Sequence, residues 1–182
     1  MTYYGNKELA ASFRTVRANT LKLAEEIPED KYGFRPAPDC RSVAETLVHI
    51  AVAPRLQAHI HFTEHLSTLN GFDFFGFFGQ LIGEEKTPRT KEQILELLRT
   101  EGENYAAKLE GASESLLAES VEYPQGMVPP TKSRFEMLMA PKEHEMHHRG
   151  HLMLVQRMLG MVPHLTRQME ERIAAMKAAA AN

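Results

Sequence analysis

The sequence has one cysteine, no long apolar run and no excess of positive charge. Because Cys40 is the only cysteine, an intrachain disulfide is excluded, and the count fits a reducing compartment. No stretch approaches the roughly 20 apolar residues of a membrane span, and residues 1–11 lack the apolar core of a secretion signal. The formal net charge of −3 differs from the basic character of most nucleic-acid-binding domains. These absences predict a soluble, cytoplasmic protein that binds neither nucleic acid nor a membrane.

What the sequence does contain is typical of one helical domain. Its 182 residues are 43% hydrophobic and 25% charged, which is enough apolar material for a buried core. Apolar residues recur at a spacing of about 3.6, and no alternation of apolar and polar residues is long enough to predict a strand. We see no internal repeat and no linker. We therefore expect residues 1–182 to form a single all-α domain.

Capping patterns and prolines set the expected helix boundaries. Capping boxes at Ser42, Thr90 and Ser133, each followed three positions later by Glu or Gln, satisfy free backbone N–H groups at helix starts. Pro54 should kink the second helix, because proline removes a backbone hydrogen bond. The glycine- and phenylalanine-rich segment 70–90 is interpreted as a loop. The sequence thus predicts a four-helix bundle with a long crossover connection plus a short C-terminal helix, with helices over residues 6–26, 42–69, 90–110, 133–159 and 165–180.

The segment 143–151 contains four of the nine histidines of the chain. Each helical residue rotates by roughly 100°, so His144 and His148 lie one turn apart on nearly the same side of their helix. Met137 and Val155 fall on the same stripe, which indicates that this side faces the core. Two imidazoles at this spacing can hold one metal ion.

A third histidine, on the second helix, completes the candidate site. His49 shares a helix face with Val52 and Leu56, so it should also point inward. An inward imidazole without a partner costs roughly 1–3 kcal/mol, and a metal ion removes that cost. We predict that one divalent ion is bound by His49, His144 and His148. A lone inward histidine is more often a core residue satisfied by a neighbour, so the pair on the fourth helix carries most of this prediction.

The remaining histidines are less suited to the interior site. His147 and His151 form a rival pair at the same spacing on the fourth helix. On a continuous second helix, His61 and His65 would lie on the outer face. His164 follows a proline in a turn and is interpreted as a surface residue.

At these positions the sequence resembles the DinB/YfiT-like metalloenzymes of the DinB superfamily. The resemblance rests on the His-x3-His-Arg-Gly motif at 144–150 and on His49 within segment 42–50. The family motif usually ends in glutamine, and His151 stands in its place here. His151 could orient a ligand from outside or enter the site itself.

The resemblance implies a bundle of unusual connectivity, often a homodimer, with a nickel- or zinc-type ion. Carried over by motif position, the three ligands are His49, His144 and His148, with water in the remaining positions. Some relatives are transferases that use low-molecular-weight thiols. We therefore expect a small-molecule substrate and a thiol as partners.

Three protein ligands and an open position are typical of catalytic rather than structural metal sites. An ion of this kind activates either a thiol or a water molecule. The resemblance favours an enzyme, a metal-dependent thiol (S-)transferase; the alternatives are a metal-dependent hydrolase and a non-catalytic metal-binding stress-response protein. Glu45, one turn before His49, is a candidate base, although its capping box also explains it. Arg149 could pair with a carboxylate or meet an anionic substrate.

Overall fold

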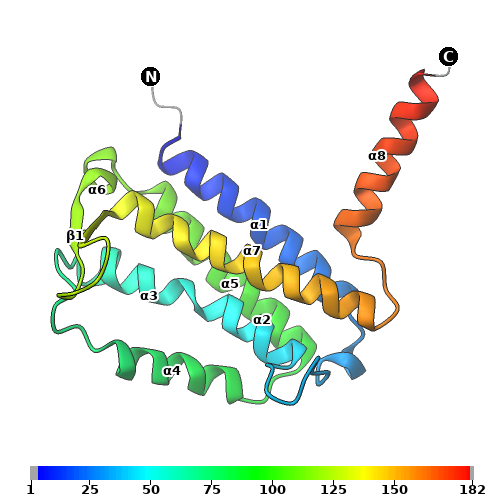
Figure 1. Cartoon of the computed structure of the whole chain (residues 1–182), viewed down its shortest axis with the longest axis horizontal. Coiled ribbons are helices and arrows are strands. Elements are labelled where there is room, and N and C mark those ends of the chain that lie inside the picture. The colour runs from blue at the N-terminus through cyan, green and yellow to red at the C-terminus, as the bar shows by residue number, and fades with distance from the viewer. Residues whose placement is uncertain (1–3, 181–182) are drawn as a thin grey trace.

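The computed structural model describes residues 4–180 as a helical bundle with one projecting helix (Figure 1). None of the described helices is both long enough and apolar enough to cross a membrane. Two short strands, β1 (Ser120–Glu122) and β2 (Thr131–Ser133), pair antiparallel, although the sequence predicts no strand. The helices are α1 (Asn6–Glu26), α2 (Val43–Val52), α3 (Pro54–Ala58), α4 (Phe74–Lys86), α5 (Lys91–Glu110), α6 (Glu114–Ala118), α7 (Arg134–Met158) and α8 (His164–Ala180).

The bundle is formed by α1, α2 with α3, α5 and α7. Helices α1 and α2 each pack against both α5 and α7. The two helices that follow one another in the chain therefore occupy opposite corners, unlike the neighbours of an up-and-down bundle. The predicted all-α four-helix bundle with a long crossover is confirmed.

The capping patterns place the bundle helices where the sequence predicts them. The Ser42 hydroxyl accepts from the Glu45 backbone N–H at 3.2 Å, and the Glu45 carboxylate accepts from the Ser42 N–H at 2.8 Å. The same reciprocal bonds open α5 at Thr90 and α7 at Ser133. Each box satisfies backbone donors that the first turn leaves free.

The second predicted helix is interrupted rather than simply kinked. Helix α2 ends at Val52, and Pro54 is the first residue of α3. A π-helical turn, η2 (His59–Thr63), follows, in which the Glu64 N–H donates to the His59 carbonyl at 2.9 Å. Both features change the angular position of every later residue relative to an unbroken helix.

The interruption explains why the predicted outer position of His61 is wrong. Its side chain is only 1% exposed. One ring nitrogen lies 2.9 Å from the Gln57 side-chain oxygen, and the other accepts from Arg134 at 3.0 Å. His65 does lie outside, paired with Glu119 at 2.7 Å, as expected.

Segment 70–90 contains helix α4, where the sequence predicts a loop. The Asp73 carboxylate caps the helix by accepting from the Gly76 N–H at 2.8 Å. Leu81 then packs against the main core cluster, and α4 runs along α2. The glycines misled the prediction because they lie within a helix that is held by tertiary contacts rather than by propensity. As a result, α4 brings its C-terminal carboxylates next to α2.

The C-terminal helix α8 extends away from the bundle (Figure 1). Its first residue, His164, is buried against α1, with its Nε2 3.3 Å from the Asn19 side-chain oxygen. The surface position predicted for His164 is therefore wrong. A turn with Gly160 at φ +78° directs the chain back toward α1, which sequence spacing alone does not reveal.

Candidate metal centre

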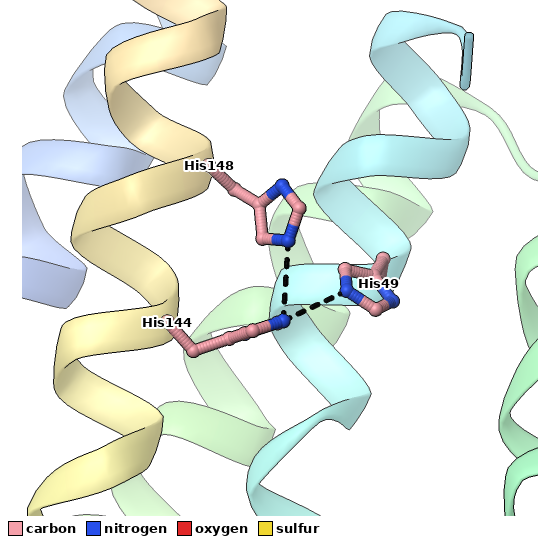
Figure 2. Close-up of side chains that lie close together, drawn as sticks. All are labelled: His49, His144 and His148. Atoms are coloured by element: carbon pink, nitrogen blue, oxygen red, sulfur yellow. Dashed lines mark hydrogen bonds between the residues drawn. The ribbon is translucent and has the colours of Figure 1, made fainter.

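The three histidines predicted as ligands lie together between α2 and α7 (Figure 2). The Nε2 atom of His144 is 2.9 Å from the Nε2 of His49 and 3.1 Å from the Nε2 of His148. All three rings thus present the same nitrogen to one point. The structure brings together residues that are 95 positions apart in the chain.

The arrangement of the nitrogens suits a divalent ion. Two nitrogens, each about 2.1 Å from an ion, lie about 3.0–3.4 Å apart for octahedral or tetrahedral angles. The observed separations of 2.9 and 3.1 Å are close to this range. One proton on the His144 Nε2 could serve only one of its two neighbours, whereas a cation accepts all three lone pairs. The residues therefore fit a three-histidine metal site.

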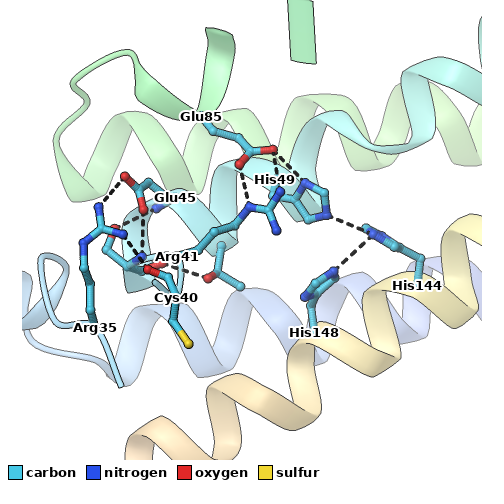
Figure 3. A network of polar contacts seen from close by, with 10 residues as sticks. Arg35, Cys40, Arg41, Glu45, His49, Glu85, His144 and His148 are labelled. Atoms are coloured by element: carbon cyan, nitrogen blue, oxygen red, sulfur yellow. Dashed lines mark hydrogen bonds and ion pairs between the residues drawn. The ribbon is translucent and has the colours of Figure 1, made fainter. Parts of the chain in front are cut away.

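A carboxylate missed in the sequence orients the first of these rings. Glu85 of α4 lies 2.8 Å from the Nδ1 of His49 (Figure 3). A carboxylate there accepts the Nδ1 proton and leaves the Nε2 lone pair free for an ion. Arg41 donates to the other oxygen of Glu85 at 2.6 Å and holds it in place. The Nδ1 of His144, by contrast, is buried without a hydrogen-bond partner among the described residues.

The environment keeps the three imidazoles neutral, the form that binds metal. Burial, together with the neighbouring His49 ring, lowers the pKa of His144 to about 4. Burial likewise lowers the pKa of His148 to about 3, together with the adjacent His144 ring. Burial also lowers the pKa of His49, although its hydrogen bond to Glu85 opposes the shift. At neutral pH an ion need displace no proton from a charged imidazole.

A buried ion pair beside the site connects all four bundle helices. Arg17 of α1 is 4% exposed and donates to both oxygens of Glu145 of α7, which is 1% exposed. Arg17 also donates to the carbonyls of Leu98 on α5 at 2.6 Å and Ile50 on α2 at 3.2 Å. Glu145 follows His144, and Ile50 follows His49. The guanidinium therefore fixes the spacing of the two helices that carry the histidines.

The space for Arg17 depends on a glycine of α5. A Cβ at Gly102 would lie 2.8 Å from the Cγ and 2.9 Å from the Nη1 of Arg17. Such contacts would force the guanidinium out of position. Gly102 is therefore needed for the close approach of α1 and α5.

Two cavities reach the histidines, and their walls differ. One, of 440 Å³, adjoins His49 and His144, and its other walls are mostly apolar. The second, of 760 Å³, adjoins His148 and has more charged side chains in its walls than the first, beside apolar ones. The Arg41–Glu85 pair contributes to the walls of both. Apolar side chains of the first cavity include Leu56, Phe78, Leu81 and Ile82; charged groups of the second include Arg35, Glu45 and Lys86.

Glu45 and Cys40 line the same cavity as His148, and both are hydrogen-bonded to Arg35. Glu45 caps α2 and also accepts from Arg35 at 2.5 Å. The Arg35 guanidinium is the main reason that the pKa of Glu45 is lowered, which makes this carboxylate a poor base. Cys40 lies in the wall of the 760 Å³ cavity, and its carbonyl accepts from Arg35 at 2.6 Å.

The other residues of the motif on α7 do not join the three histidines, although His151 lines the 760 Å³ cavity beside His148. His147 and His151 are exposed, with ring centres 4.3 Å apart. Arg149 donates to the Val16 carbonyl at 3.5 Å, so its contact in the bundle is a backbone oxygen. A Cβ at Gly150 would meet no described atom within 4 Å, so this glycine does not serve close helix packing.

Fold and site together define a helical bundle with a candidate three-histidine metal centre. The chain belongs to the DinB superfamily, whose sequence profile matches residues 12–152. The family resemblance found in the histidine motif is thereby confirmed.

Relatives from Bacillus subtilis agree with this assignment. The uncharacterized protein YjoA is 26% identical over 155 residues, which are 85% of this chain and 91% of YjoA. Its crystal structure matches with a TM-score of 0.62 at 24% identity, over 85% of this chain and 94% of that one. YfiT, described as a probable metal-dependent hydrolase with an unusual four-helix bundle topology, matches with a TM-score of 0.67 at 15% identity. That match covers 88% of this chain and 91% of YfiT. At these identities the structures support the fold alone.

Proposed function

We propose that this chain is a metal-dependent enzyme that joins a low-molecular-weight thiol to an electrophilic small molecule. The observation that carries the proposal is the convergence of three Nε2 atoms between two unlike cavities. A hydrolase needs room for one organic substrate and water. Two cavities that meet at one site provide room for two organic substrates.

The walls of the cavities suggest which substrate occupies which side. Leu81 and Ile82 suit the hydrophobic part of the electrophile. Lys86 and Arg35 suit the charged groups that small biological thiols carry. In the reaction the thiol sulfur bonds to the electrophilic carbon, the leaving group departs with the bonding electrons, and the thiol proton is released.

The protein side chains supply binding and orientation. His49, His144 and His148 would hold the ion, and Glu85 would fix the ring of His49. A bound ion would lower the pKa of the thiol and so raise the fraction of thiolate at neutral pH. A donor set of three imidazoles suits zinc and nickel, which are the ions we propose. The homodimer implied by the family resemblance and the cytoplasmic location predicted from the sequence stay predictions.

The test is turnover with and without metal. We expect protein loaded with zinc or nickel to conjugate monobromobimane or a chlorodinitrobenzene with cysteine or another small thiol. The chelated protein and a His148→Ala variant should not. A His65→Ala variant is the matched control, because His65 is an exposed histidine away from the site. Protein that retains its ion but converts no pair of thiol and electrophile would refute the proposal in favour of a non-catalytic metal-binding protein.

Hydrolysis is the second candidate, supported by the description of YfiT as a probable metal-dependent hydrolase. The same ion would then activate water, with an apolar ester or amide in the 440 Å³ cavity. Hydrolysis of p-nitrophenyl acetate by the loaded protein without any thiol would favour this reaction. Acceleration that requires the thiol would favour transfer.

A further inference from the structure

The outer side of α7 carries a second group of histidines. The ring centres of His147 and His151 are 4.3 Å apart, and the ring centre of His148 lies 5.1 Å from the first and 5.7 Å from the second. One nitrogen from each of the three rings lies within 4.8 Å of the others. Neither His147 nor His151 has a hydrogen-bond partner among residues 4–180. Both rings are therefore available to an ion from solution.

Two imidazoles one helical turn apart are already arranged to chelate a divalent ion. Because His147 and His151 are exposed, an ion bound there keeps most of its water and the site loses little solvation. Two ligands bind less tightly than three, so the outer group should hold an ion more weakly than the interior group. Such a difference favours net movement of the ion inward.

His148 belongs to both groups. From His151 the rings follow one another to His147, His148, His144 and His49, with successive centres 4.3, 5.1, 4.5 and 4.7 Å apart. An ion could pass along this series by exchanging one imidazole at a time. It would therefore never need to be fully released between the surface and the interior.

We propose that His147 and His151 form a second, exposed site for a divalent cation, which captures the ion and speeds the loading of His49, His144 and His148. The loading role rests on the proposed function, because it requires the interior histidines to bind the ion. The exposed site itself requires only the outer rings. The two parts can therefore be measured separately.

The test compares the full-length wild-type protein with the variant His147→Gln/His151→Gln. A His59→Gln/His65→Gln variant controls for the loss of two histidines outside α7. Titration calorimetry with zinc alone should show one tight and one weak ion per chain in the wild type and the control, and only the tight ion in the α7 variant. Stopped-flow transfer of zinc from a colorimetric chelator should be several-fold slower in the α7 variant, with the same final occupancy.

A weak ion retained by the α7 variant would overturn the exposed site. Loading at the wild-type rate after loss of the weak ion would overturn its role in loading. If the wild type binds only a weak ion that the α7 variant loses, the exposed site stands while the proposed function fails.

Discussion

Helix α7 presents two histidine pairs with the same spacing to two different environments. His144 and His148 meet His49 of α2 in a partly buried site, and Glu85 orients that third ring. His147 and His151 face solvent and have no partner on another helix within residues 4–180. Spacing alone therefore creates a chelating pair. The rest of the fold decides which pair meets a third histidine whose ring is oriented by a carboxylate.

The largest expected effect comes from removing the buried ion pair that holds α7, with His144 and His148, close to α2. Glu145→Gln removes the charge that Arg17 contacts in the core, so we expect a loss of about 3–5 kcal/mol in the free energy of unfolding. Glu143→Gln, on the exposed side of the same turn, should change it by less than about 0.5 kcal/mol. Urea unfolding of both variants measures this. Equal losses would show that the buried pair has no special role.

Removing a bound ion should lower the stability of the protein without unfolding the bundle. The helices are held by apolar cores and capping boxes, not by the metal. We expect chelated protein to keep its far-ultraviolet circular dichroism while its stability falls by about 3–4 kcal/mol, if free metal was at 100 to 1,000 times its dissociation constant. Loss of most of the helical signal would instead indicate a structural site.

Removing the carboxylate of Glu85 beside His49 should have a smaller effect, on the metal affinity of the three interior histidines. Glu85→Gln cannot accept the Nδ1 proton as strongly, so metal affinity should fall by about 10–100-fold. Glu84→Gln is the control, because Glu84 pairs with Arg55 and Arg89 rather than with a histidine. Competition with a calibrated chelator measures both. An unchanged affinity in Glu85→Gln would remove this carboxylate from the site.

The smallest expected effect is the pH dependence of the metal-free protein. The pKa values of about 4 for His144 and about 3 for His148 lie below the ordinary value of 6.5. Between about pH 6.5 and 4, the unfolded chain therefore binds more protons than the folded chain, and stability falls as the pH is lowered. Above that window these groups contribute no pH dependence. Urea unfolding at pH 7.5 and 5 should show the loss, and His144→Gln/His148→Gln should reduce it; an equal loss in that variant would assign it to other groups.

Local patterns were sufficient to predict the inner histidines. The capping boxes at Ser42 and Ser133 fix the two helix starts, and the apolar stripe then orients His49, His144 and His148. Because each of these signals lies within one helix, sequence spacing can reveal it.

Contacts that depend on tertiary packing were not predicted. Glu85 lies on α4, whose glycines indicated a loop, so the carboxylate beside His49 was missed. Arg17 and Glu145 are 128 positions apart, and no local pattern links them. The break at Pro54 and the π-helical turn turned His61 inward, which a regular helical wheel cannot show.

The metal content of three untagged proteins tests the central difference most directly. Wild type, His148→Ala and His147→Ala would be loaded with zinc or nickel, passed through a desalting column to remove weakly held ions, and analysed by plasma mass spectrometry. We predict about one ion per chain in the wild type and His147→Ala, and little in His148→Ala. Equal content in all three proteins, or no retained ion in the wild type, would contradict a metal centre formed by His49, His144 and His148.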